Sequence, residues 1–272
     1  MSDAQGEAED TEVLHLPLLE ESLAYEKADP KPSWRGWIHL GTLPLAIAAG
    51  IVLIVLADGV GATVTSAIFA TSSWLLFGIS GTYHRFNWGP TTKVVLKRLD
   101  HANIFLLIAG TYTPVAWLAL PQEKAVFLLS LIWSGALLGI GFRVFWISAP
   151  RWLYVPIYLG LGWAAVLYIQ DLFAANLATM ILVIVGGLAY SVGAIVYGTK
   201  WPNPSPRHFG FHEIFHVLTV VAFLSHWTAV LLVAINPPLV GYPHRASPRF
   251  LTDSALAEPV GPCRGPKAPR QS

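Results

Sequence analysis

Two histidines lie four residues apart in the stretch HFGFHEIFHVLTVVAFL, which begins at His208. The string HEIFH, from His212 to His216, fits the pattern H-E-x-x-H. In zinc proteases that pattern places two histidine ligands on one helix face, with the glutamate as general base. Because a long apolar run follows the string, three interpretations are open: a protease helix, a different metal site, or two histidines that share a face by chance.

Three further polar residues could complete a metal site. Ser80 and His84 are four residues apart, so they share a helix face, and Asp100 follows in the next apolar segment. Three imidazoles and a water form a tetrahedral zinc site with one open position, and zinc lowers the pKa of that water to about 7. We therefore predict a zinc ion held by His84, His212 and His216. Asp100 would accept a proton from the water or position it, and Ser80 would bind the water or an oxyanion.

Each of these residues also has a simpler role. A serine in a membrane helix often bonds the carbonyl one turn back, which would account for Ser80. Asp100 could act as the N-terminal cap of the helix that follows it, and a carboxylate with two oxygens can serve both roles. Taken individually, the other histidines are expected to be packing or interfacial residues: His39, His101, His208 and His226.

The elements that must position these side chains are membrane helices. Of the 272 residues, 54% are hydrophobic and only 12% are charged, about half the charge of a soluble domain. A spanning helix needs about 20 apolar residues. We predict an all-α bundle of seven transmembrane helices, near residues 38–57, 63–83, 101–120, 125–146, 152–169, 177–198 and 211–235.

The distribution of basic residues predicts the orientation, because lysine and arginine gather in cytoplasmic loops. The N-terminal segment and the even-numbered loops hold eleven basic residues, whereas the odd-numbered loops hold only Lys124. The N-terminus is therefore expected in the cytoplasm and the C-terminus outside, although Arg245 and Arg249 in the C-terminal segment argue mildly against this. Ser80, His84, Asp100 and the two histidines of HEIFH would then lie at the cytoplasmic ends of their helices.

The two ends of the chain differ from the apolar region. We predict an acidic, disordered cytoplasmic segment over 1–36, a membrane domain over 37–236 and a disordered segment rich in proline and arginine over 237–272. A net charge of +1 argues against nucleic acid, and the single cysteine, Cys263, excludes a disulfide framework. Membrane lipids are the expected partners, while a homo-oligomer and protein partners remain open.

Three stretches resemble a known family: SGTYHRFNW, RLDHANIFLLIAGTYTPVAWLAL and GFHEIFHVLTVVAFLSHW. Together they are similar to the hemolysin III proteins of bacteria, which belong with the progestin and adipoQ receptors (PAQR) and, more distantly, the alkaline ceramidases. The resemblance covers roughly residues 33–236, and His39 occupies a recurrent histidine position. It implies a seven-helix protein of the plasma membrane with zinc on the three histidines, Asp100 contacting the metal through water and Ser80 nearby. Its relatives imply hydrolysis of a lipid amide.

Four functions remain in view. A membrane-embedded zinc protease would use Glu213 as base, but the Leu-Asp pair of those enzymes follows H-E-x-x-H, whereas RLDH precedes it here. The favoured hypothesis is a zinc-dependent hydrolase of a lipid amide or ester. A receptor-like or structural protein stapled by zinc is the alternative. A haemolytic pore ranks lowest, because spans this apolar offer no polar stripe for a water-filled channel.

Overall fold

The computed structural model describes residues 32–146 and 149–238. Within these ranges the chain is all-α, with seven segments long and apolar enough to cross a membrane. The elements are α2 (Trp37–Leu56), α3 (Val60–Arg85), α4 (Pro90–Ala119), α5 (Gln122–Phe145), α6 (Arg151–Gly162), the 3₁₀ helix η1 (Ala164–Tyr168), α7 (Ile169–Ala175), α8 (Leu177–Thr199) and α9 (Phe211–Ile235). The fifth span, Trp152–Ala175, combines α6, η1 and α7, so the predicted number of spans is confirmed.

The helix boundaries follow from residues that favour helix ends. Pro90 occupies the first turn of α4, where its missing N–H costs nothing. Asn176 precedes α8, and its side-chain oxygen accepts a hydrogen bond from the backbone N–H of Thr179 at 2.9 Å. Gly36 and Gly59 precede α2 and α3 with φ of 83° and 89°, a backbone conformation that glycine adopts without strain.

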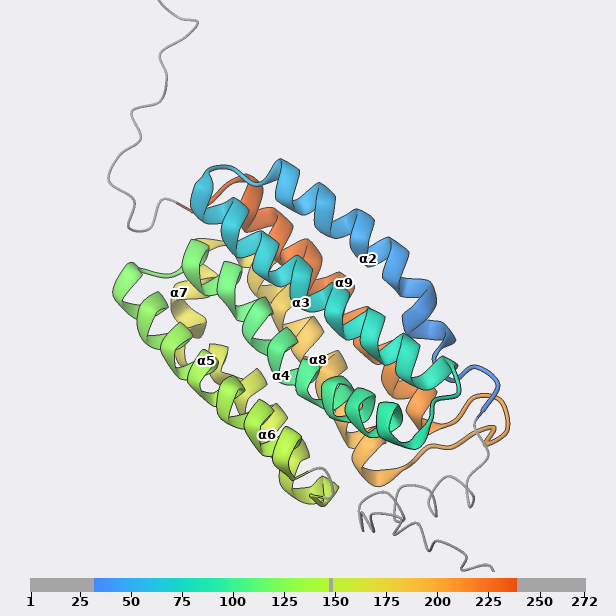
Figure 1. Cartoon of the computed structure of the whole chain (residues 1–272). Helices are drawn as coiled ribbons and strands as arrows, with labels where there is room; N and C mark the ends of the chain where they lie inside the picture. The colour runs from blue at the N-terminus through green and yellow to red at the C-terminus, as the bar shows by residue number, and fades with distance from the viewer. Residues whose placement is uncertain (1–31, 147–148, 239–272) are drawn as a thin grey trace, which may run out of the picture. The chain divides into compact units, whose positions relative to one another are not determined.

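The last helix closes the bundle. Sequential helices pack side by side from α2 to α5, and α9 lies against α2, α3, α4 and α8 (Figure 1). Phe77 of α3 and Phe223 of α9 meet with ring centroids 5.1 Å apart, and both side chains are buried. This arrangement places the end of α3 beside the beginning of α9, which are far apart in the sequence.

The third span begins earlier than predicted. We expected it to start near residue 101, with Asp100 as its cap, but α4 begins at Pro90 and places Asp100 well inside the helix. The capping role is therefore wrong. The basic segment TTKVVLKRL lies between the predicted spans, yet it is helical because nothing in it after Pro90 interrupts helical backbone bonding.

The fifth span is interrupted where it was predicted to be continuous. The α-helical pattern ends at Gly162 and resumes at Ile169 after one 3₁₀ segment. The hydroxyl of Tyr112 bridges the interruption: it donates to the carbonyl of Gly162 at 2.6 Å and accepts from the N–H of Ala165 at 2.8 Å. A side chain of α4 thus satisfies backbone groups that the broken helix leaves free.

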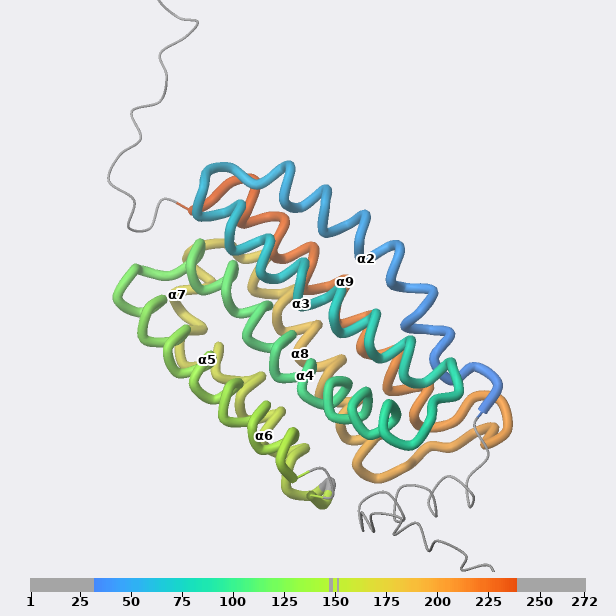
Figure 2. Tube along the Cα trace, viewed as in Figure 1, coloured from blue at the N-terminus to red at the C-terminus, as the bar shows by residue number. Residues whose placement is uncertain are grey.

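The predicted terminal segments, 1–36 and 237–272, lie almost wholly outside the described residues, so their disorder stays a prediction. Residues 33 to 36 form a turn that leads into α2. This turn lies beside the connection between α8 and α9, as the trace in Figure 2 shows. Two backbone hydrogen bonds join them, from Ser33 N–H to the carbonyl of Arg207 and from Trp34 N–H to that of His208.

Candidate metal centre

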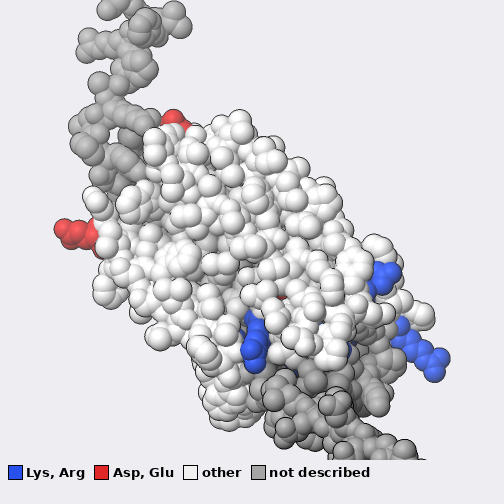
Figure 3. Space-filling view, viewed as in Figure 1, with Lys and Arg blue, Asp and Glu red and all other residues white. Residues whose placement is uncertain are grey.

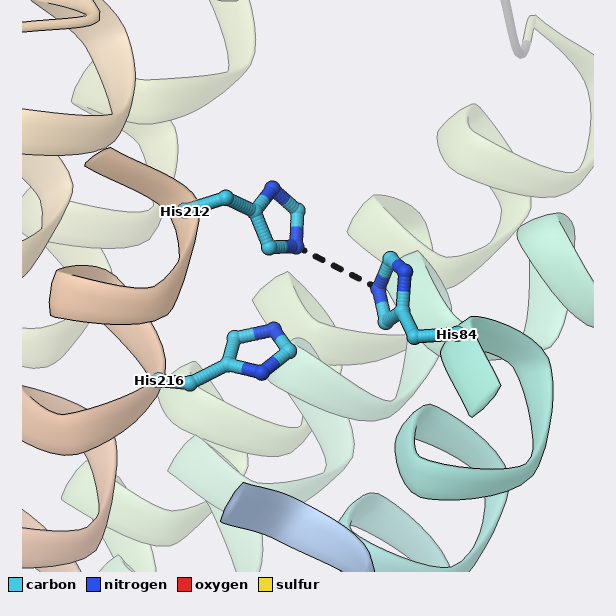
Figure 4. Close-up of side chains that lie close together, drawn as sticks. All are labelled: His84, His212 and His216. Atoms are coloured by element: carbon cyan, nitrogen blue, oxygen red, sulfur yellow. Dashed lines mark hydrogen bonds between the residues drawn. The ribbon is translucent and has the colours of Figure 1, made fainter. Parts of the chain in front are cut away.

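The three predicted histidine ligands come together. His84 lies at the last turn of α3, and His212 and His216 face it from the first two turns of α9 (Figure 4). The Nε2 atoms of His84 and His212 are 3.3 Å apart, and one ligand nitrogen from each of the three residues lies within 4.8 Å of the others. We call these three residues the histidine cluster.

The donor set fits a divalent metal ion that prefers imidazole. With zinc–nitrogen bonds of about 2.0–2.1 Å, two ligands of a tetrahedral ion are about 3.3 Å apart. The separation of His84 and His212 has this value, and a ligand nitrogen of His216 lies within 4.8 Å of the other two residues. Among the described residues the group contains three donors, which leaves the fourth position of a tetrahedral ion open.

Glycine lets α2 approach the helix that carries His84. A Cβ on Gly36 would lie 2.6 Å from the backbone nitrogen of Arg85 and 2.9 Å from the carbonyl carbon of His84. One turn earlier, a Cβ on Gly81 would lie 2.9 Å from the backbone nitrogen of Leu40. Both contacts are with backbone atoms that cannot rotate away. The two glycines therefore fix the position of the last turn of α3.

Asp100 and Ser80 lie beside the cluster, as the sequence predicts. The Oδ2 atom of Asp100 is 3.4 Å from Nε2 of His84, the nitrogen that faces His212. Ser80, buried one turn before His84, also contacts the carboxylate of Asp100. A metal ion bound by the cluster would therefore lie near a carboxylate that could hold a water molecule.

The surroundings of Glu213, the glutamate of the H-E-x-x-H string, indicate a structural role. Its side chain is only 1% exposed and makes two hydrogen bonds. One oxygen accepts from the backbone N–H of Gly210 at 2.9 Å and caps α9, and the other accepts from Nε of Arg35 at 3.0 Å. The bond from Gly210 caps the start of α9, and the bond from Arg35 joins that start to the turn before α2. This carboxylate is therefore engaged in holding the helix that presents His212 and His216.

Sequence reasoning missed how closely His39 approaches the centre. Its ring stacks on that of His216 with centroids 3.8 Å apart and an angle of 9° between the planes. His39 is buried, as expected of a packing residue. The ring that it packs against belongs to a histidine of the cluster, so His39 holds that ring in place. The available signal was the family resemblance, in which His39 occupies a recurrent histidine position.

A cavity of about 570 Å³ opens from the histidine cluster into the bundle. Most of its lining is apolar, and its wall along α8 runs from Tyr197, near the end of that helix, to Met180, near its beginning. Seventeen residues of helix span about 25 Å. The cavity is therefore long and narrow enough for an extended acyl chain, with the cluster at one end.

Comparison with known proteins assigns this chain to a family. The family described as Haemolysin-III related matches residues 28–227. The chain belongs to the haemolysin-III related family. It is 33% identical over 200 residues to a hemolysin-3 homolog of Bacillus subtilis (strain 168), covering 72% of this chain and 91% of that protein.

Two further relatives extend the haemolysin-III related comparison. Hemolysin-3 of Bacillus cereus is 35% identical over 173 residues, covering 62% of this chain and 77% of that protein. Heptahelical transmembrane protein ADIPOR2 of Oryza sativa subsp. japonica is 28% identical over 180 residues, covering 60% and 79%. These matches confirm the resemblance to hemolysin III and PAQR proteins, and with the seven spans they establish a multi-pass membrane protein.

Proposed function

We propose that this chain is a zinc-dependent membrane hydrolase that cleaves a lipid amide or ester. The observation that carries the proposal is an open three-histidine cluster at the end of an apolar cavity inside a membrane bundle. A zinc ion bound there by His84, His212 and His216 would supply a Lewis acid and lower the pKa of a coordinated water. The cavity would hold the acyl chain, so that its carbonyl stands at the cluster.

The residues around the cluster support the remaining steps. Asp100 is placed to take the proton of the attacking water and to return it to the leaving nitrogen or oxygen. Ser80 contacts the carboxylate of Asp100 and fixes its direction. Apolar side chains along the cavity exclude bulk water, which strengthens the electrostatic interactions inside.

The charge distribution supports a cytoplasmic site in the cell membrane. Basic residues lie at the helix ends that carry the cluster, whereas the acids Glu123 and Asp171 lie at the opposite ends. On the face shown in Figure 3, the most prominent red side chains lie at one end and the blue ones lie toward the other, where a small red area is also visible. The positive-inside rule therefore supports our proposal that the N-terminus and the cluster lie at the cytoplasmic side of the membrane, which we propose is the plasma membrane.

A lipid-turnover assay with Asp100→Asn tests the proposal. The full chain is reconstituted in vesicles that contain one N-acyl lipid and one ester lipid, and the released fatty acid is measured together with bound metal. We expect the variant to keep its metal and to lose at least about 100-fold in rate, the contribution of a general base. Asp171→Asn, at the other end of the bundle, is the matched control and should keep the wild-type rate.

The same experiment separates the hydrolase from a structural zinc protein. The cluster joins α3 to α9, so a zinc ion there could serve only to staple helices. In that case chelation would lower the melting temperature, while neither lipid would be cleaved by the wild type. Retention of metal and of the full hydrolytic rate in Asp100→Asn would refute the role assigned to Asp100.

A further inference from the structure

Arg143, near the end of α5, is a buried cation with unused hydrogen-bond donors. Its side chain is only 1% exposed, and its Nε and Nη1 atoms have no hydrogen-bond partner among the described residues. Its guanidinium lies over the ring of Tyr154, 4.2 Å from the centroid. Burying a charge without an opposite charge costs several kcal/mol, so an arginine in this position is expected to meet an anion.

The guanidinium borders the same cavity as the histidine cluster. Arg35, another cation of the lining, is paired with Glu213. Among the described residues Asp100 is the single carboxylate in the lining, and it lies against His84. Among the described residues no carboxylate of the lining is therefore paired with Arg143, and its free donors are available to a negatively charged guest.

Tyrosine rings separate Arg143 from the metal centre. The hydroxyl of Tyr154 lies 3.4 Å from that of Tyr197, and the ring of Tyr197 lies 5.6 Å from that of His212. An anionic group bound at Arg143 and a carbonyl group bound at the histidine cluster would therefore be two separate groups of the ligand. One molecule that reached both would need an acyl carbonyl and a charged headgroup.

We propose that Arg143 binds the anionic oxygen group, a phosphate or a carboxylate, in the headgroup of a lipid whose acyl chain occupies the cavity. A guanidinium suits this task because its fork of N–H donors matches the oxygens of either group. That this lipid is also the substrate rests on the proposed function. Binding itself requires no turnover, so the site can be tested without hydrolysis.

Equilibrium binding to the full chain in detergent, treated with EDTA and followed by native mass spectrometry, tests the site. Four probes are compared: phosphatidic acid, the diacylglycerol with the same two acyl chains, the free fatty acid, and inorganic phosphate alone. The variants are Arg143→Met and Arg143→Gln. Arg207→Gln, an exposed arginine outside the cavity lining, is the matched control.

We expect the wild type to bind an anionic lipid at least about tenfold more tightly than diacylglycerol, the value of a charge-assisted hydrogen bond. Both Arg143 variants should lose this preference, and Arg207→Gln should keep it. If phosphatidic acid binds in an Arg143-dependent way, the headgroup is a phosphate. If the fatty acid does so, the headgroup is a carboxylate. If inorganic phosphate alone binds equally well, the ligand is a free anion and the lipid proposal is wrong.

Equal affinity of the wild type for phosphatidic acid, fatty acid and diacylglycerol would overturn the proposal, even if neither variant folds. An unchanged preference in Arg143→Met or Arg143→Gln would overturn it as well. Failure of the hydrolysis assay leaves these binding results untouched, so the two proposals fail separately.

Discussion

Replacing Glu213 by glutamine is expected to destabilise the chain without disabling its chemistry. The carboxylate is buried, accepts one bond from Arg35 at 3.0 Å and caps α9 through Gly210 at 2.9 Å. Glutamine keeps one acceptor oxygen and loses the charge that faces Arg35. A protease in which Glu213 is the general base would respond in the opposite way, with unchanged stability and no activity.

The magnitude follows from the two hydrogen bonds. A bond to a charged group contributes about 1.5–3 kcal/mol, and the 16% exposure of Arg35 places this pair toward the lower end. For a chain of this size, 1 kcal/mol shifts the melting temperature by about 2–4 °C, so Glu213→Gln should melt about 3–8 °C lower. Glu213→Ala, which also removes the cap, should lose about 3–5 kcal/mol.

The assay is thermal unfolding of the full chain in one detergent at one scan rate, combined with metal content and lipid turnover. Glu123→Gln, an exposed glutamate at the opposite end of the bundle, is the control and should shift stability by less than about 0.5 kcal/mol. A double-mutant cycle with Arg35→Met should show coupling between the two positions. An unchanged melting temperature together with abolished turnover and retained metal would refute the reasoning and revive the protease.

Three further substitutions test other parts of the structure. His39→Phe should keep the stack on His216 and the wild-type metal affinity. His39→Ala should lower the metal affinity by about 10-fold in a metal-competition titration. Equal affinities of the two variants would show that the stack does not matter for metal binding. Tyr112→Phe should cost about 1–3 kcal/mol in thermal unfolding, because it leaves the groups at the α6 break without a partner, and an unchanged melting point would contradict this. Lys124→Gln, which breaks an exposed pair with Asp171, should cost less than about 1 kcal/mol and only at low salt; a larger, salt-independent loss would contradict the exposed character of that pair.

Much of the fold could be predicted because apolar length and charge placement are read directly from the sequence. The seven spans were found from runs of apolar residues, and the last, 211–235, has the predicted bounds. The start of α4 was missed because its first turns are basic and project beyond the apolar run. The interruption after Gly162 was missed because the partner that stabilises it, Tyr112, lies on another helix.

The candidate site was predictable to the extent that its members share a helix face or a depth. The i and i+4 spacing joined His212 to His216, and the count of spans brought His84 to the same level. Arg143 was counted only as a loop cation, since burial and missing partners are properties of the packed bundle. The ion pair of Glu213 was also hidden, because its partner Arg35 lies 178 residues earlier in the sequence.

Metal analysis of the purified full chain, prepared without a polyhistidine tag, tests the central claim most directly. The wild type is predicted to carry one zinc ion per chain, and His84→Ala and His216→Ala are predicted to lose it. His208→Gln, an exposed histidine outside the cluster, should keep it. Equal metal content in all four proteins, or none in the wild type after zinc loading, would contradict a metal centre at the histidine cluster.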